Sequence, residues 1–162
     1  MTVRVVTDST AALPAATAAA WGLTIVPTRV TLGGVSLRAG ALSLSELLAR
    51  FDEGGSTSGP PPGAFAAALE GATDGAVIIT VAANLSSSYK AAVAGAAILP
   101  EVPVRVVDSG SAAGAQALAA RHAAEVAARG GSLDEVEAAA RRVLKSARLY
   151  GALETFEYLV RG

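Results

Sequence analysis

Short apolar runs and longer alanine-rich stretches alternate along the chain. The apolar runs are rich in valine and isoleucine, end in polar residues, and lie at 3–6, 77–81 and 104–107. The alanine-rich stretches are long enough for helices and lie at 13–21, 86–98 and 111–129. The run at 77–81 lacks polar alternation, which is typical of a parallel strand covered on both faces. The pattern predicts an α/β fold, a three-layer α/β/α sandwich with a mainly parallel sheet.

Proline and glycine divide the region between the first two of these strands. Residues 23–32 are rich in threonine, valine and isoleucine and are predicted as a strand, in which Pro27 indicates an edge position or a bend. Gly33-Gly34 predicts a tight turn into a hairpin. The stretch 54–63 contains three consecutive prolines and several glycines, so we expect a loop of about ten residues, followed by a short helix.

Two capping boxes mark the start of further helices. Each has a serine followed three residues later by a glutamate, at Ser43 with Glu46 and at Ser132 with Glu135. In this spacing the two side chains satisfy each other's backbone amides. Beyond the second helix, residues 149–153 are predicted as a last strand and 155–161 as a last helical piece.

Polar segments with several hydroxyls follow the predicted strands. They read Thr7-Asp8-Ser9-Thr10, Ser86-Ser87-Ser88 and Asp108-Ser109-Gly110-Ser111. Because the carboxyl ends of parallel strands share one edge, we expect these side chains around one crevice, where open α/β sheets bind ligands. Helix capping is enough to explain the serines and threonines of the first and third segments. The second segment and Ser56-Thr57-Ser58 hold more hydroxyls than a cap requires, and such neutral donors beside a helix N-terminus suit a carboxylate or phosphate.

Composition narrows the classes of function. The 162 residues fit one domain, and a formal charge of −1 gives no basic field for nucleic acid. The chain has no cysteine and a single histidine, His122, which we interpret as a surface or helix-packing residue. No glycine-rich phosphate loop follows the first strand. We therefore predict neither a metal nor another cofactor, and a binding protein rather than a catalyst.

Two further observations concern location. The apolar runs are all much shorter than the roughly 18 residues of a membrane span. The first residues enter a strand pattern directly, without the basic and apolar regions of a secretory signal. We expect a cytoplasmic protein with no membrane span.

Several short motifs together resemble the DegV family. In chain order they are Val6-Thr7-Asp8-Ser9-Thr10-Ala11 with Leu13-Pro14, Ile25-Val26-Pro27, Thr57-Ser58 before a proline, Leu85-Ser86 with Tyr89, Val107-Asp108-Ser109, and the segment from Leu153 to Gly162. The motifs extend over essentially the whole chain. Each is weak alone, and their common order makes the set specific.

The resemblance implies a function. DegV proteins bind fatty acids, and some are the acyl-carrying subunit of bacterial fatty acid kinase, which presents the bound carboxylate to a separate kinase protein. By this likeness a long-chain fatty acid would have its tail in an apolar tunnel and its head group on Thr57, Ser58 and Ser86, with Ser88 in reserve. Supporting candidates at the same sheet edge are Asp8, Ser9, Asn84, Asp108 and Ser109.

The chain also departs from the family pattern. Ser58-Gly59-Pro60-Pro61 stands where relatives usually have Ser-Gln-Pro-Ser, and Asn84-Leu85-Ser86-Ser87-Ser88 stands for Gly-Leu-Ser-Gly-Thr. The usual second domain, which adds a histidine, an arginine and much of the tunnel wall, is absent. We interpret residues 1–162 as a single DegV-like N-terminal domain, either natural or a fragment, whose uncovered apolar face suggests a homodimer.

Two other functions remain open at this level. The first alternative to fatty-acid binding is a phosphoryl or acyl transferase that uses Asp8 or Asp108 as acid, base or metal ligand. The second is a degenerate interaction domain that has lost its ligand. An enzyme needs a carboxylate free to act in a cleft, whereas a carrier needs both aspartates only as caps.

Overall fold

A four-stranded parallel sheet forms the centre of the computed structural model, which describes residues 2–156 and 160. Its strands lie in the order β2-β1-β6-β7. They are β1 (Arg4–Asp8), β2 (Leu23–Val26), β6 (Ala76–Thr80) and β7 (Val104–Asp108). The strands predicted from the valine- and isoleucine-rich runs at 3–6, 77–81 and 104–107 are all present. Strand β6 is buried along its whole length, as its unbroken apolar sequence predicts.

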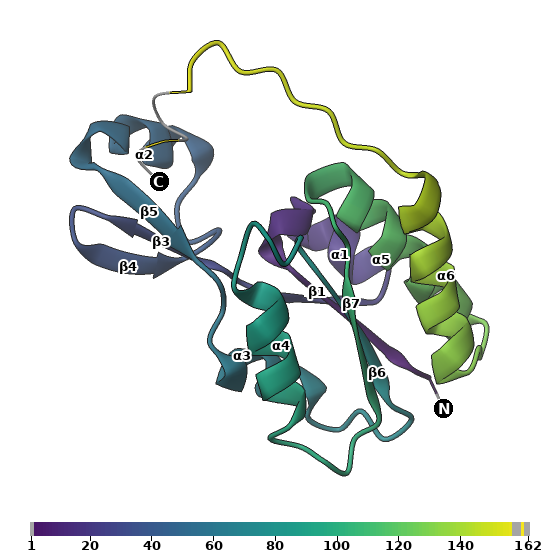
Figure 1. Ribbon diagram of the computed structural model, residues 1–162. Helices are drawn as coiled ribbons and strands as arrows, with labels where there is room; N and C mark the ends of the chain where they lie inside the picture. Colours follow the sequence, from purple (N-terminus) through teal and green to yellow (C-terminus); the bar gives the residue numbers. More distant parts are fainter. Residues whose placement is uncertain (1, 157–159, 161–162) are drawn as a thin grey trace.

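Helices cover both faces of this sheet (Figure 1). One face carries α1 (Ala15–Ala20), α5 (Ala113–Ala128) and α6 (Leu133–Ser146), and the other carries α3 (Pro62–Leu69) and α4 (Ser88–Ala96). Alternate residues of β6 serve the two layers, with Val77 and Ile79 toward α5 and Ala76 and Ile78 toward α3 and α4. The predicted α/β/α sandwich is confirmed.

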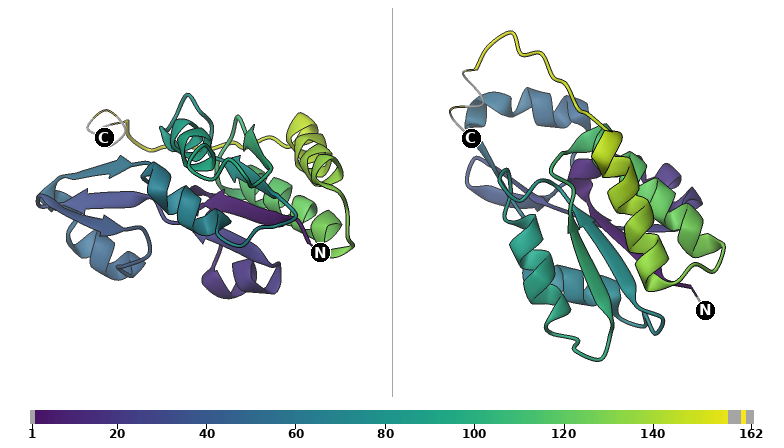
Figure 2. Two further views of the ribbon diagram at one scale, coloured as in Figure 1. Left: turned by 90° about the horizontal axis from the view of Figure 1, so that it is seen from below. Right: turned by 45° about the vertical axis from the view of Figure 1, so that its right-hand side comes forward.

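A second, antiparallel sheet is inserted between β2 and α3. It has the order β4-β3-β5, with β3 (Arg29–Leu32), β4 (Val35–Arg38) and β5 (Gly55–Ser58). The short helix α2 (Leu44–Ala49) and a 3-10 turn (Phe51–Glu53) connect β4 to β5. Figure 2 shows this sheet projecting from the four-stranded one. The segment 23–32 is thus two strands in two sheets, separated at the bend that Pro27 predicts.

Three sequence predictions need correction. The stretch 54–63 is not a continuous loop, because β5 occupies Gly55–Ser58 and α3 begins at Pro62. An edge strand tolerates glycine, and the prolines all follow it, with Pro62 at a helix start that needs no amide. Residues 149–153 form no strand, and Thr155 and Phe156 are not helical. The rest of the predicted last helix lies largely outside the described residues.

Both capping boxes are confirmed. The Glu46 amide donates to Ser43 Oγ (3.3 Å), and the Ser43 amide donates to Glu46 Oε2 (2.8 Å). Ser132 and Glu135 make the same pair of bonds at the start of α6. Hydrogen bonds from the serine side chain and backbone lower the pKa of Glu46, and the same two bonds, the backbone one foremost, lower the pKa of Glu135. Among the described helices, none combines the length and apolarity needed to cross a bilayer.

The packing of α3 on α4 depends on a glycine. A Cβ atom on Gly95 would lie 2.6 Å from the Pro62 carbonyl oxygen and 2.7 Å from Phe65 Cβ. We predict that Gly95→Ala lowers the free energy of unfolding by about 1–3 kcal/mol, because the helices must separate. The control is Gly114→Ala in α5, where a Cβ meets nothing within 4 Å. This change should raise the same quantity by up to about 1 kcal/mol, since alanine favours helix. Urea denaturation measures both, and equal effects would contradict the close packing.

Candidate functional site

The carboxylate of Asp8 joins three segments at the end of β1. Asp8 is fully buried. Its Oδ2 accepts a hydrogen bond from the Val81 amide (3.0 Å), just after β6. Its Oδ1 accepts from the Thr10 amide (3.1 Å) and from Gln116 Nε2 on α5 (3.0 Å), and also contacts the Thr10 hydroxyl. Asp8 is therefore a cap and a cross-link, and both of its oxygens are occupied.

Gln116 completes this network on the α5 side. Its Nε2 also donates to Thr7 Oγ1 (2.9 Å), and the Thr7 hydroxyl donates to the Ile79 carbonyl (2.7 Å). All these side chains are uncharged amides or hydroxyls, and Thr7 and Gln116 are fully buried. The network ties β1, β6 and α5 together at the carboxyl edge of the sheet.

Ser9 connects the first sheet to the second. Its Oγ lies 2.8 Å from Thr28 Oγ1 and accepts from the Thr28 amide (3.0 Å). Thr28 immediately precedes β3, on which β5 pairs. Ser9 thus fixes the second sheet, and Thr57 with it, relative to the end of β1.

Asp108 and Ser109 organise the turn after β7. Asp108 Oδ1 accepts from the amides of Ala83 (3.1 Å) and Gly110 (2.9 Å). Ser109 Oγ donates to the Ser111 carbonyl (2.9 Å) and accepts from the Ser111 amide (3.1 Å). These contacts occupy both side chains with backbone groups of the turns that follow β6 and β7.

Gly59 brings the two hydroxyl-rich segments into contact. A Cβ atom built on it would lie 2.6 Å from Ser87 Oγ and 3.0 Å from the Ser88 amide nitrogen. Only a residue without a side chain allows this approach. The segment after β5 therefore rests on the first turn of α4, and residues some 30 positions apart in the sequence become neighbours.

The register of the second sheet separates Thr57 from Ser58. Thr57 pairs with Val30, and Ser58 pairs with Arg29. Neighbouring residues of a strand point to opposite faces, so Thr57 shares the face of the apolar residues and Ser58 shares the face of the arginine. Gly59 precedes a proline, which favours extended backbone. Thr57, which is exposed, lies on the Val30 face two residues before Gly59.

Ser86 and Ser88 lie at the N-terminus of α4. Their hydroxyl oxygens are 3.0 Å apart, and the Ser88 amide donates to Ser86 Oγ (3.2 Å). Ser88 is fully buried and Ser86 half-buried, whereas Asn84 and Leu85 are exposed. The N-cap residue, Ser87, makes no side-chain cap. Ser86 thus takes up the first amide of α4, and the Ser87 side chain caps none of the amides that follow, at the helix end where the dipole favours an anion.

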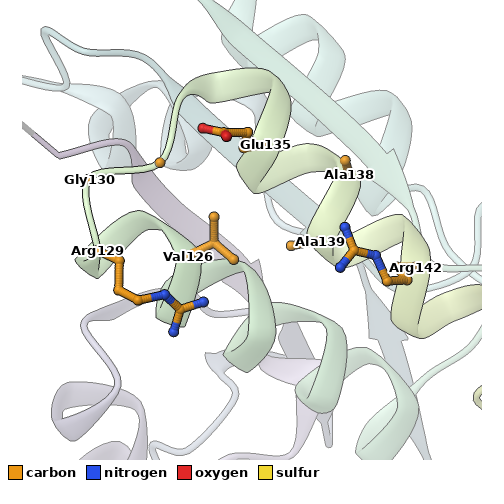
Figure 3. A pocket seen from close by; sticks show the side chains of 8 residues that line it. Val126, Arg129, Gly130, Glu135, Ala138, Ala139 and Arg142 are labelled. Atoms are coloured by element: carbon orange, nitrogen blue, oxygen red, sulfur yellow. The ribbon is translucent and has the colours of Figure 1, made fainter.

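The two described grooves lie elsewhere. The larger, of about 490 Å³, separates the end of α5 from the start of α6, with Arg129 and Arg142 beside it (Figure 3). It lies at the amino ends of the strands, where Arg129 complements the last carbonyls of α5. The smaller, of about 410 Å³, is lined by Ser109, Ser111 and Arg148 among others. Neither is lined by Thr57, Ser58, Ser86 or Ser88.

No group of three histidines, cysteines, aspartates or glutamates close enough to hold a metal ion occurs in the part of the chain that the structure describes. His122 lies on α5, half-exposed, with Nδ1 3.4 Å from Glu125 Oε2. Arg121 beside it bonds the same glutamate and lies over the Trp21 ring, 5.2 Å from its centroid. These contacts fit the prediction that His122 packs on the helix surface.

Comparison with known proteins assigns the family. The model of the DegV family, described as an uncharacterised protein family, matches residues 2–162. The chain belongs to the DegV family. A DegV domain-containing protein of Streptomyces coelicolor is 40% identical over 167 residues, which cover 99% of this chain and 59% of that protein. The DegV domain described here thus spans little more than half the length of the curated relatives it matches.

Solved DegV structures share the fold. A fatty-acid-binding DegV family protein from Thermus thermophilus is 31% identical, with a TM-score of 0.78 over 90% of this chain and 54% of that one. A protein from Thermotoga maritima, whose structure revealed a fatty acid binding function, is 28% identical, with a TM-score of 0.76 over 90% of this chain and 56% of that one.

Sequence reasoning missed residues that hold the segments of this candidate site together. Gln116, Thr28 and Val81 did not stand out, yet each bonds Asp8 or Ser9. Val81 and Thr28 donate through their backbone amides. Because nearly every residue type has this group, the sequence gives no sign of these bonds. Gln116 is the one polar residue with a long side chain in the first half of an alanine-rich helix, which is a usable signal.

The contacts of Asp8 and Asp108 predict that replacing aspartate with asparagine affects the free energy of unfolding differently at the two positions. Asp8→Asn places an amide donor among the donors of Val81, Thr10 and Gln116, and should lower the free energy of unfolding by about 1–3 kcal/mol. Asp108→Asn retains the single oxygen that accepts both backbone bonds, and should change it by less than about 0.5 kcal/mol. Urea denaturation of the two variants checks this. Equal losses would show that the Asp8 network is not the stronger constraint.

Proposed function

We propose that this DegV domain binds a long-chain fatty acid, with the carboxylate at the first turn of α4. The observation that carries the proposal is the close approach of Gly59, two residues after Thr57, to Ser87 and Ser88. The fatty-acid-binding DegV proteins that share the fold support the same ligand class.

Uncharged donors are suited to this head group. The amides at the start of α4 and the hydroxyls of Ser86 and Ser88 offer hydrogen bonds to a carboxylate, and the helix dipole favours negative charge there. We assign the hydroxyl from the second sheet to Thr57, because it lies on the Val30 face two residues before Gly59. In this proposal Ser58 lies on the opposite face. Asn84, which is exposed, borders the mouth.

Burial of the acyl tail provides most of the affinity. Each buried methylene contributes about 0.8 kcal/mol before the costs of binding, so a long chain outweighs the head group. Exposed Leu85 lies next to Ser86, and Val93 follows on α4 with 46% of its surface exposed. These apolar side chains give the tail a first surface at the mouth of the proposed apolar tunnel.

The proposed role is that of a carrier, which presents the carboxylate to a fatty acid kinase. A transferase using Asp8 or Asp108 is less well supported, because backbone and side-chain donors already occupy Asp8 on both oxygens and Asp108 bonds two amides. The aspartates act as the caps that a carrier requires.

Native mass spectrometry tests the ligand. We expect the purified chain to carry acyl chains, or after delipidation to take up added oleate at one equivalent. A spectrum of the ligand-free chain alone, unchanged by oleate at concentrations far above those of the protein, would contradict the proposed function.

Hydroxyl deletions test the head-group site. Thr57→Ala and Ser86→Ala should each weaken oleate binding by about five- to tenfold, because each removes one hydrogen bond to the carboxylate. Ser56→Ala is the matched control, as it deletes a hydroxyl from the same strand on the opposite face. Titration calorimetry compares the three. Unchanged affinity in both site variants would place the carboxylate elsewhere.

A further inference from the structure

Thr80, the last residue of β6, has a buried hydroxyl with no hydrogen-bond partner. It is the one buried side-chain polar atom in the described part of the chain without a partner, and the residue is 0% exposed. The backbone around it is satisfied, because the Ser109 amide donates to the Thr80 carbonyl (3.1 Å) and the Val81 amide to Asp8. Buried polar groups are nearly always paired, so this hydroxyl calls for a specific partner.

The Thr80 side chain lies on the sheet face that α3 and α4 cover. Ile78 and Ala76, two and four residues earlier, pack in one cluster with Phe65 and Ala92, and alternate residues of a strand point to the same face. Thr80 is therefore directed toward the layer that contains α4.

The direction of α4 then brings Thr80 to the first turn of that helix. Helix α4 leads from the end of β6 back to the start of β7, so it runs antiparallel to β6. Ser88 stands one turn before Ala92, and Thr80 stands two residues after Ile78, steps of about 6 Å each. Buried Ser88 and Thr80 thus lie at corresponding levels of α4 and β6, so the Thr80 hydroxyl is on the sheet face that the first turn of α4 covers.

We propose that Thr80 donates the inner hydrogen bond to the ligand carboxylate, behind Ser86 and Ser88. This inference rests on the proposed function and adds a specificity-determining residue to the same site. The carboxylate enters between the end of β6 and the first turn of α4, where it accepts a hydrogen bond from the one unpaired buried hydroxyl and lies at the positive end of the helix dipole. The site then selects a fatty acid over a neutral lipid of the same chain length.

A pair of substitutions separates the hydroxyl from the methyl group. Thr80→Val keeps the shape and removes the hydroxyl, and it should weaken oleate binding about tenfold or more, the loss expected for a hydrogen bond to a charged group. The melting temperature of the ligand-free variant should stay equal or rise, because no bond is lost in the free protein. Thr80→Ser keeps the hydroxyl and should bind oleate within about threefold of wild type.

Thr7→Val is the matched control. It makes the same change one strand away, on the face toward α5, to a hydroxyl that is paired with Ile79 and Gln116. It should lower the melting temperature of the ligand-free protein. A fall of similar size in Thr80→Val would show that the Thr80 hydroxyl has a structural partner, and would overturn the inference.

Oleate and oleyl alcohol distinguish the remaining outcomes. The loss in Thr80→Val should be large for oleate and small for the alcohol. If Thr80→Val binds oleate as wild type does, while Thr80→Ser binds weakly, Thr80 acts through packing and the inference is wrong although the proposed function stands. A wild-type chain that takes up no oleate overturns the proposed function itself, and the inference with it.

Discussion

A buried carboxylate with uncharged partners is the constraint on which the rest of the candidate site depends. Removing the Asp8 carboxylate from water costs several kcal/mol, and only well-placed donors offset this. Val81, Thr10 and Gln116 supply them from three separate segments. Any displacement of these segments leaves a buried charge short of a donor. The turn after β6, which leads to Ser86 and Ser88, is therefore held in one place.

Ser9, the residue after Asp8, fixes the position of the second sheet in a similar way. Ser9 bonds the amide and the hydroxyl of Thr28 at the start of β3, and β3 carries β5 by strand pairing. Two consecutive residues at the end of β1, Asp8 and Ser9, thus position both segments of the candidate site, one through Val81 and one through Thr28. This arrangement allows a site on two segments distant in sequence to form without a charged side chain at its centre.

The sequence predicts the layers well and the polar network poorly. Alternation, capping boxes and the buried run of β6 depend on local residue types, which the sequence displays directly. The sequence predicts a loop where β5 lies, because glycine and the nearby prolines disfavour a strand. The strand forms there because it pairs with β3. Gln116 bonds partners more than 100 residues away, and Thr80 has the residue type of an ordinary strand position, so only the three-dimensional arrangement reveals either.

The contact at Gly59 explains one departure of this chain from the family pattern that it resembles. That pattern has a glutamine at position 59 and a glycine at position 87, whereas this chain has Gly59 and Ser87. A side chain at 59 collides with the serine oxygen at 87, since the Cβ would lie 2.6 Å away. In this chain the absence of a side chain at position 59 lets the backbone after β5 lie against the first turn of α4.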